Sequence, residues 1–173
     1  MSLFLDTFAG KKVLISGHTG FKGSWLATWL EILGAQVIGI ALDPPSQPSH
    51  FEVAGLTEIL DDHRLDIRDC EDLKYLVSQT QPDFVFHLAA QPLVHQSYLD
   101  PVGTYQTNVL GTLNMLEALR HLEQKCTAVL ITSDKCYDNV EWVWGYREND
   151  ALGGPDPYSA SKASSEIIIR AYR

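Results

Sequence analysis

Short, almost continuous apolar runs alternate along the chain with longer segments in which apolar residues recur at every third or fourth position. The continuous runs predict five strands that are buried on both faces. They cover residues 11–17, 36–42, a stretch within 58–65 that precedes Asp66, 82–90 and 127–133. The periodic segments predict helices over residues 21–35, about 70–79, 101–123 and 158–173.

This order of strand and helix is typical of an α/β fold with a doubly wound parallel sheet. Residues 43–56 are rich in Pro and Ser and are expected to be largely loop. In the helix over 21–35, the spacing predicts one apolar face made by Trp25, Leu26, Trp29, Leu30 and Leu33. Residues 1–173 are therefore interpreted as a single Rossmann-type domain, in which ligands bind outside the carboxyl ends of the strands.

The composition limits the kinds of molecule that the protein is expected to bind. The chain has 173 residues, of which 45% are hydrophobic, and a formal net charge of −9. This acidic balance argues against nucleic-acid and anionic-membrane partners. Residues 1–12 lack the features of a secretory signal, the apolar runs are too short for a membrane span, and the three cysteines form no metal or disulfide pattern. We expect a soluble, cytoplasmic protein with free thiols.

The first predicted strand runs into the stretch "SGHTGFKGSW", where Gly17, Gly20 and Gly23 are spaced by three. Glycines between a strand and a helix let backbone amides approach a pyrophosphate at the positive end of the helix. The alternative is a tight turn with a closely packed helix. The stretch predicts a dinucleotide site, whose expected contacts include Thr19, Phe21 and Lys22.

The second predicted strand ends at Asp43, an acid that can accept hydrogen bonds from an adenosine ribose. The alternative is an ordinary Asp-Pro turn. No Lys or Arg lies between Gly39 and Pro48 to meet a 2′-phosphate, which favours NAD over NADP. After the third strand, Asp66 and Ile67 are placed near an adenine, although an acid at a helix N-terminus is an alternative interpretation of Asp66.

The stretch "HLAAQ", residues 87–91, closes the fourth predicted strand. Its residues Leu88, Ala89 and Ala90 are expected where the backbone passes close to the dinucleotide, and two of them are small. His87 is interpreted as a packed strand residue and not as a catalyst.

Two further groups carry candidate chemistry. The stretch "LITSDKCYDN" ends the fifth strand with Asp134 beside Lys135, which is either a solvated turn or a proton-transfer site. Tyr158 and Lys162, in "YSASK", lie four apart and share one face of a helix. An ammonium near a phenol lowers the phenol pKa from about 10, so Tyr158 could accept a proton while hydride leaves for NAD. An exposed helix face is the alternative.

Taken in order, these stretches resemble the extended short-chain dehydrogenase/reductase family across nearly the whole chain. The resemblance implies that Ser133 or Thr132 hydrogen-bonds the sugar hydroxyl that is oxidised. It also implies that Tyr158 is the base and that Lys162 holds the nicotinamide ribose and tunes Tyr158. The implied cofactor is NAD.

Sugar-nucleotide dehydratases of that family carry an acid and a second proton-transfer residue after the fifth strand, most often Asp-Glu. The pair here is Asp134-Lys135, which resembles such a dehydratase and implies a nucleotide-sugar substrate for a lyase of deoxysugar biosynthesis. Asp134 would then protonate the leaving hydroxyl, and Lys135 would take the place of the base. The alternatives are an epimerase or another dehydratase of the family, or a non-catalytic NAD-binding domain.

Members of that family are about twice as long and have a smaller C-terminal lobe that holds the nucleotide. We therefore expect an N-terminal portion that binds NAD weakly or not at all and turns over poorly. We also expect an exposed edge at the fifth strand. The family resemblance further implies a homo-oligomer formed through residues 101–123 and 158–173.

Overall fold

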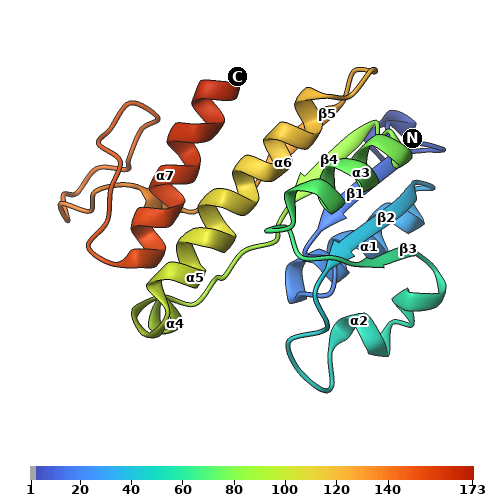
Figure 1. The fold of residues 1–173 in the computed structure, drawn as a ribbon, viewed down its shortest axis with the longest axis horizontal. Helices are drawn as coiled ribbons and strands as arrows, with labels where there is room; N and C mark the ends of the chain where they lie inside the picture. The colour runs from blue at the N-terminus through green and yellow to red at the C-terminus, as the bar shows by residue number, and fades with distance from the viewer. Residues whose placement is uncertain (1–2) are drawn as a thin grey trace.

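The computed structural model describes residues 3–173, so the first two residues of the N-terminal stretch lie outside it. Five strands form one parallel sheet in the order β3-β2-β1-β4-β5, as Figure 1 shows. They are β1 Lys12–Ser16, β2 Gln36–Ala41, β3 Asp61–Arg64, β4 Phe84–His87 and β5 Thr127–Leu130. The predicted doubly wound parallel sheet is confirmed, and the order reverses between β1 and β4.

Helices cover both faces of this sheet. The longer ones are α1 Phe21–Ile32, α3 Cys70–Thr80, α6 Gly111–Arg120 and α7 Pro157–Tyr172. The shorter helices and turns are Leu3–Asp6, α2 His50–Val53, Leu56–Glu58, α4 Val94–Leu99, α5 Pro101–Tyr105, the π-helical turn Gln106–Leu110 and the 3-10 turn Asp134–Cys136. The helix predicted over 101–123 is thus α5, a π-helical turn and α6 in succession, and it ends at Arg120.

Successive side chains of β1 point to opposite faces of the sheet and pack into two separate hydrophobic cores. Val13 and Ile15 pack with Ala27 and Leu30 of α1 on one face of the sheet. Leu14 packs on the other face with residues of α3 and α6, among them Leu73, Val77, Met115 and Ala118. Because both faces are covered, the inner strands are apolar at nearly every position, which is the pattern that predicted them.

Residues 43–56 are largely loop, as predicted, and they also contain the short helix α2, which begins with a capping box between Ser49 and Glu52 and buries Phe51. The predicted apolar face of α1 was wrong. The buried face of α1 consists of Gly23, Ser24, Ala27 and Leu30. Trp25 and Trp29 are 53% and 48% exposed, because small residues let α1 lie close to the sheet and turn the indoles outward; Trp25 stacks on His50 of α2.

The fifth strand is shorter and more exposed than the predicted strand over 127–133. Its last ladder pair joins Leu130 to His87, the final residue of β4, so the residues after it have no strand partner. Val129 is 40% exposed, and β5 is an edge strand of the sheet, as expected. Among residues 3–173, none of the helices is both long enough and apolar enough to cross a membrane.

Candidate active site

The turn after β1 is built from glycines that leave no room for side chains. Gly17 has a φ of +82°, and its N–H donates to the carbonyl oxygen of Ile40 at 2.7 Å. A Cβ atom on Gly23 would lie 2.1 Å from the carbonyl oxygen of Gly17. Gly20 is the N-cap of α1, so the turn leads directly into the positive end of that helix.

The end of β4 packs against this turn at the place where the strand order reverses. The Leu88 N–H donates to the Ser16 carbonyl at 3.0 Å, and the Ala89 N–H donates to Ser16 Oγ at 3.2 Å. A Cβ atom on Gly17 would lie 2.8 Å from the Ala89 nitrogen. The segment 88–90 therefore passes close to the glycine turn, and its contact with a dinucleotide stays a prediction.

His87 lies beneath this junction and is 3% exposed. Its Nδ1 is 2.7 Å from Ser16 Oγ and its Nε2 is 3.3 Å from Thr112 Oγ1. Burial lowers the pKa of His87 to about 3, with a smaller contribution from the charge of Lys162. The imidazole is therefore neutral and structural, and the interpretation of His87 as a packed strand residue is confirmed.

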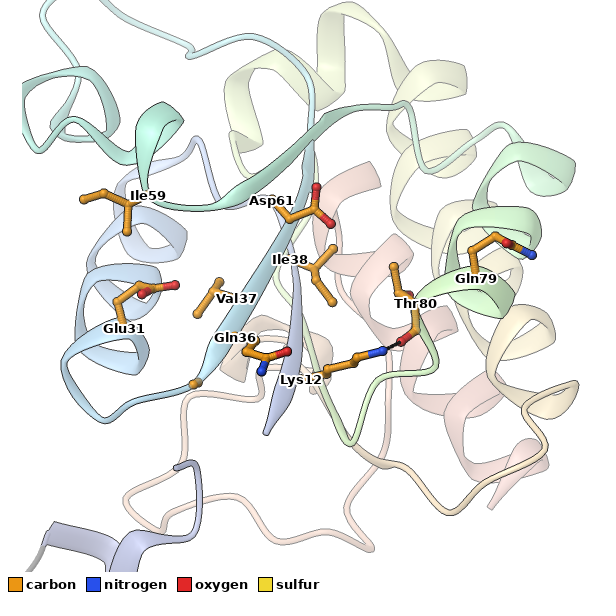
Figure 2. Close-up of a pocket in the computed structure, with 10 residues that line it drawn as sticks. Lys12, Glu31, Gln36, Val37, Ile38, Ile59, Asp61, Gln79 and Thr80 are labelled. Carbon is orange, nitrogen blue, oxygen red and sulfur yellow. Dashed lines mark hydrogen bonds between the residues drawn. The ribbon is translucent and has the colours of Figure 1, made fainter. Parts of the chain in front are cut away.

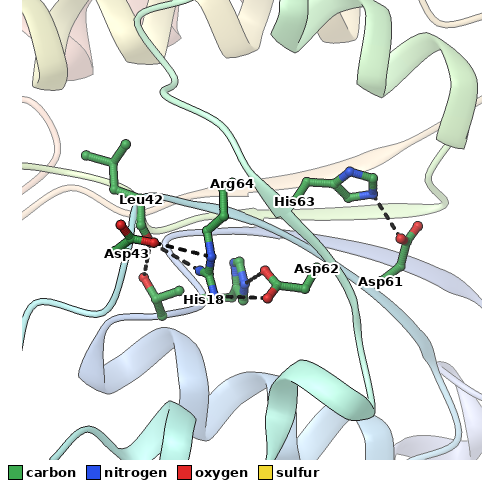
Figure 3. A network of polar contacts seen from close by, with 8 residues as sticks. His18, Leu42, Asp43, Asp61, Asp62, His63 and Arg64 are labelled. Carbon is green, nitrogen blue, oxygen red and sulfur yellow. Dashed lines mark hydrogen bonds and ion pairs between the residues drawn. The ribbon is translucent and has the colours of Figure 1, made fainter. Parts of the chain in front are cut away.

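The predicted ribose acid, Asp43, follows β2 and has a side chain that is 94% exposed. The preceding residue, Leu42, is linked to the glycine turn, because its carbonyl accepts from Thr19 Oγ1 at 3.0 Å. Arg64 Nε, from the end of β3, lies 3.7 Å from Asp43 Oδ1 (Figure 3). The sequence prediction considered basic residues only between Gly39 and Pro48, and so it missed Arg64. Arg64 belongs to β3, and the register pair Ala41–Arg64 places it beside the end of β2.

The remaining predicted cofactor contacts, Phe21 and Lys22 after β1 and Ile67 after β3, differ in burial. Phe21 is 75% exposed and Lys22 is exposed, both in the first turn of α1. Ile67 is buried, and its side chain fills the space beside Gly111 of α6. Phe21 and Lys22 are thus free of the core at the helix end that faces the predicted pyrophosphate.

Asp66 lies at the edge of an open cavity of about 480 Å³, whose other lining residues are Arg68, Asp69, Gln106, Leu110 and Asn114. Arg68 Nε donates to both Asp66 oxygens, at 3.0 and 2.9 Å, and this contact lowers the pKa of Asp66. The N-cap of α3 is Asp69, so Asp66 is not the acid of that helix end. The alternative interpretation of Asp66 as the acid of the helix end is therefore not supported, and its place near an adenine stays a prediction.

A second open cavity, of about 500 Å³, lies at the opposite edge of the sheet (Figure 2). It is formed at the amino ends of β1, β2 and β3, where Lys12 Nζ donates to the carbonyl of Thr80 at 3.0 Å. Since ligands of such sheets bind at the carboxyl ends of the strands, we do not assign this cavity to the candidate active site.

The turn after β5 presents its acid and its amine to solvent. Ser133 is the N-cap of the 3-10 turn Asp134–Cys136, and its Oγ lies 3.1 Å from Asp134 Oδ1. Lys135 Nζ lies 3.7 Å from the same carboxyl oxygen, and the two side chains are 54% and 86% exposed. The hydroxyl of Thr132 instead donates to the carboxylate of Glu166 on α7, so Ser133 is the better placed of the two candidate hydroxyls.

The other two candidate catalytic residues occupy consecutive turns of α7. Asp156 caps this helix by accepting from the Ser159 N–H at 2.9 Å, which places Tyr158 in the first turn. Lys162 is 6% exposed, and its Nζ donates to the carbonyl of Ile131 at 3.2 Å. Burial lowers the pKa of Lys162. This hydrogen bond uses one of three N–H donors and joins α7 to the end of β5.

Sequence reasoning missed Asn108, which ties the parts of the site together. It is 1% exposed and lies in the π-helical turn, a feature that is frequent at functional sites. Its Nδ2 donates to the Gln91 carbonyl at 3.1 Å and to Ser161 Oγ at 2.9 Å. Its Oδ1 accepts from the Gln91 N–H at 2.8 Å. In the sequence, the only indication of this role was that Asn108 is a polar residue on the core side of a predicted helix.

These features define a Rossmann-like dinucleotide-binding fold in which Tyr158 and Lys162 occupy the helix that packs beside the end of β5. The residues fit a dinucleotide because the glycine turn leaves backbone amides, and no side chains, before the start of α1. An acid follows β2, and a cavity follows β3.

The chain belongs to the family described as GDP-mannose 4,6 dehydratase, whose sequence pattern matches residues 14–173. Among curated relatives, a CDP-glucose 4,6-dehydratase of Salmonella typhimurium is 53% identical over 164 residues, which cover 95% of this chain and 46% of the relative. A dTDP-glucose 4,6-dehydratase of Neisseria meningitidis is 31% identical over 94% of this chain and 49% of the relative.

Solved structures give the same picture of the fold. A UDP-glucose 4-epimerase of Thermus thermophilus in complex with NAD has a TM-score of 0.79 and 29% identity, covering 93% of this chain and 50% of that one. A UDP-glucose 4-epimerase of Thermotoga maritima with UDP-glucose has a TM-score of 0.80 and 26% identity over 93% and 50%. The chain thus spans about half the length of the relatives it matches.

Proposed function

We propose that this chain serves in the NAD-dependent 4,6-dehydration of CDP-glucose to CDP-4-keto-6-deoxyglucose, a hydro-lyase reaction. The observation that carries the proposal is the 53% identity over 95% of the chain to a CDP-glucose 4,6-dehydratase. The position of Ser133, Asp134 and Lys135 directly after β5, beside the helix that carries Tyr158 and Lys162, supports the proposal. Because the chain spans 46% of that relative, the proposal concerns the activity of the whole protein.

The cofactor would lie across the carboxyl ends of the strands. The turn from Gly17 to Gly23 would hold the pyrophosphate, and Asp43 would accept from the adenosine ribose. The cavity beside Asp66 would take the adenine, and the backbone of Ile67 would pass near it. Lys162, which has donors to spare beyond its bond to Ile131, would reach the nicotinamide ribose.

In the first step, Tyr158 removes the proton of the sugar 4-hydroxyl, and Ser133 orients that hydroxyl. NAD, when bound, would accept the hydride from carbon 4 and return it to carbon 6. Tyr158 suits the role of base because it lies near the N-terminus of α7, one helical turn from the buried ammonium of Lys162. Positive charge at both places stabilises a phenolate.

In the second step, the new 4-keto group acidifies the proton on carbon 5. A base removes this proton while Asp134 protonates the 6-hydroxyl, the bond from carbon 6 to oxygen breaks, and water leaves. A proton then returns to carbon 5 as carbon 6 is reduced. Asp134 suits the role of acid because it is exposed beside Ser133 at the substrate edge of the sheet.

We propose Lys135 as the base for carbon 5. A lysine must lose its proton to act in this way, which burial or a cationic neighbour would favour. In this structure Lys135 is half-exposed, and its neighbour is the Asp134 carboxylate. The role therefore requires that bound substrate cover Lys135 or engage Asp134.

A second candidate is a nucleotide-sugar 4-epimerase, because the solved structures described above include epimerases. Epimerisation through carbon 4 needs Tyr158 and the cofactor but no acid to expel a hydroxyl. The adjacent Asp134 and Lys135 therefore favour the dehydratase over the epimerase.

We also propose that two copies associate through α5–α6 and α7, which pack side by side (Figure 1). Exposed apolar side chains on these helices, including Val102 and Ile167, support such an interface.

We further propose a cytoplasmic location, which the free thiols of Cys70, Cys126 and Cys136 support because the cytoplasm is reducing. The proposed product, CDP-4-keto-6-deoxyglucose, would serve the synthesis of deoxysugars of surface polysaccharides such as lipopolysaccharide.

The test is mass spectrometry of CDP-glucose after incubation with the protein and NAD, with dTDP-, UDP- and GDP-sugars in parallel. The proposal expects loss of one water from CDP-glucose and from none of the other sugars. Equal dehydration of another nucleotide sugar would overturn the specificity, and isomerisation without loss of water would favour the epimerase.

A further inference from the structure

Arg64 is held in a fixed position at the end of β3. Its Nη1 donates to the Leu42 carbonyl at 3.2 Å, and its Nη2 donates to Asp62 Oδ2 at 2.9 Å. Its guanidinium carbon lies 5.0 Å from the centre of the Phe51 ring, and Phe51 is a buried core residue. A carbonyl, a carboxylate and an aromatic ring thus fix this cation.

The anchor of Arg64 is itself tied to the glycine turn. Asp62 Oδ1 lies 2.8 Å from Nε2 of His18, which is fully buried within that turn (Figure 3). His18 sits over Gly39 of β2, where a Cβ atom would approach the imidazole to 2.6 Å. The position of the Arg64 charge is therefore set by the core of the domain.

Asp43 is the exposed partner in its contact with Arg64. Its side chain is 94% exposed, and 3.7 Å separate its carboxyl oxygen from Arg64 Nε. Such exposed pairs contribute only about 0–1 kcal/mol, so the pair does not determine where the guanidinium lies. If Asp43 loses its charge, Arg64 remains in place, and its position depends on Asp62 and Leu42.

We propose that Arg64 is a specificity-determining residue of the adenosine-ribose site, and this rests on the proposed binding of NAD. With Asp43 charged, the carboxylate accepts from the ribose 2′-hydroxyl and repels a 2′-phosphate. With Asp43 neutral, the guanidinium becomes the binding group for the 2′-phosphate of NADP. Arginine has five N–H donors, of which Leu42 and Asp62 use two, so donors remain for a phosphate.

A cycle of four proteins tests this inference: the parent, Asp43→Asn, Arg64→Met and the double variant. Binding of NADH and NADPH is titrated by nicotinamide fluorescence, without substrate. Asp43→Asn is expected to tighten NADPH binding at least about tenfold, which corresponds to about 1.4 kcal/mol. In the Arg64→Met background, the same change is expected to tighten it less than about threefold.

Two controls separate the charge of Arg64 from its packing. Arg64→Lys, combined with Asp43→Asn, keeps a positive charge near position 43. It should retain part of the increase in NADPH affinity. Asp43→Asn combined with Arg120→Met should retain the full gain, since Arg120 pairs with Glu117 on α6, away from this site. Thermal unfolding of every variant checks that the fold is kept.

The outcomes distinguish this inference from the proposed function. An equal NADPH gain with and without Arg64 means that Asp43 acts by repulsion alone, and it overturns the inference while NAD binding stands. The four proteins are prepared as the whole protein. A parent that binds neither dinucleotide at millimolar concentration overturns the proposed cofactor, and the inference fails with it.

Discussion

The turn after β1 and the turn after β5 lie at the same edge of the sheet but are built in opposite ways. The first consists of backbone without side chains: a Cβ atom on Gly23 would come within 2.1 Å of the Gly17 carbonyl oxygen. The second consists of side chains with little around them: Asp134 and Lys135 are 86% and 54% exposed. One turn is part of the core, and the other projects from it.

The two turns should therefore respond differently to substitution. A change in the glycine turn is expected to alter the fold and the proposed cofactor site together, because the same close packing forms both. A change at Asp134 or Lys135 is expected to alter the proposed chemistry with little effect on the fold, because these side chains have few contacts to lose. Lys162 combines both properties, since it is buried in α7 and also faces the end of β5.

The largest expected effect is at the catalytic edge. Tyr158→Phe is expected to lower turnover of CDP-glucose about a thousandfold, because the base is lost. The free energy of unfolding should change by less than about 1 kcal/mol, because the ring is retained. Product formation by mass spectrometry and urea unfolding measure the two effects. Retained turnover would remove Tyr158 from the catalytic set.

A stability test probes the glycine turn. Gly23→Ala is expected to lower the free energy of unfolding by about 3 kcal/mol, because the new Cβ atom would meet backbone that cannot move aside. Gly145→Ala is the matched control from the β5–α7 loop. A Cβ atom there would have no heavy atom within 4 Å, and a change within about 0.5 kcal/mol is expected. Similar urea midpoints for the two variants would contradict the contrast between the turns.

The role of Lys135 gives the next effect in size. If Lys135 is the base at carbon 5, Lys135→Met should slow net dehydration about a hundredfold. Oxidation at carbon 4 should continue and be visible as reduced-cofactor absorbance. Lys135→Glu should restore part of the dehydration rate. An unimpaired Met variant would exclude Lys135 as the base.

The smallest effect concerns pH and His87. Its folded pKa of about 3 lies below the ordinary value of 6.5. Between these values the unfolded chain binds the extra proton, so the stability from neutral His87 is fully present above pH 6.5 and is lost as pH falls toward 3. The expected loss is about 2 kcal/mol between about pH 6.5 and 5.

His87→Gln should flatten this part of the stability curve, measured by urea unfolding at each pH. The exposed His121→Gln is the control and should follow the parent curve. If the His87 variant also follows the parent curve, the buried imidazole does not couple folding to pH.

Sequence reasoning succeeded where the determining interactions are local. The inner strands were recognised because both faces are buried, and the glycine turn was recognised because strand, turn and helix are contiguous. It failed at the outward-facing Trp25 and Trp29, because close packing of α1 on the sheet decides which side is buried. It overextended β5, because the strand ends where β4 ends, which periodicity within one segment does not reveal.

The sequence by itself determined the parallel α/β architecture, the glycine turn and the helical spacing of Tyr158 and Lys162. Only the tertiary structure decided that Arg64 stands beside Asp43, that Asn108 joins Gln91 to α7, and that Lys162 reaches Ile131. The physical reason is that each of these contacts crosses between elements far apart in the chain. Strand register and helix packing set such contacts, and both follow from how the whole domain buries its two cores.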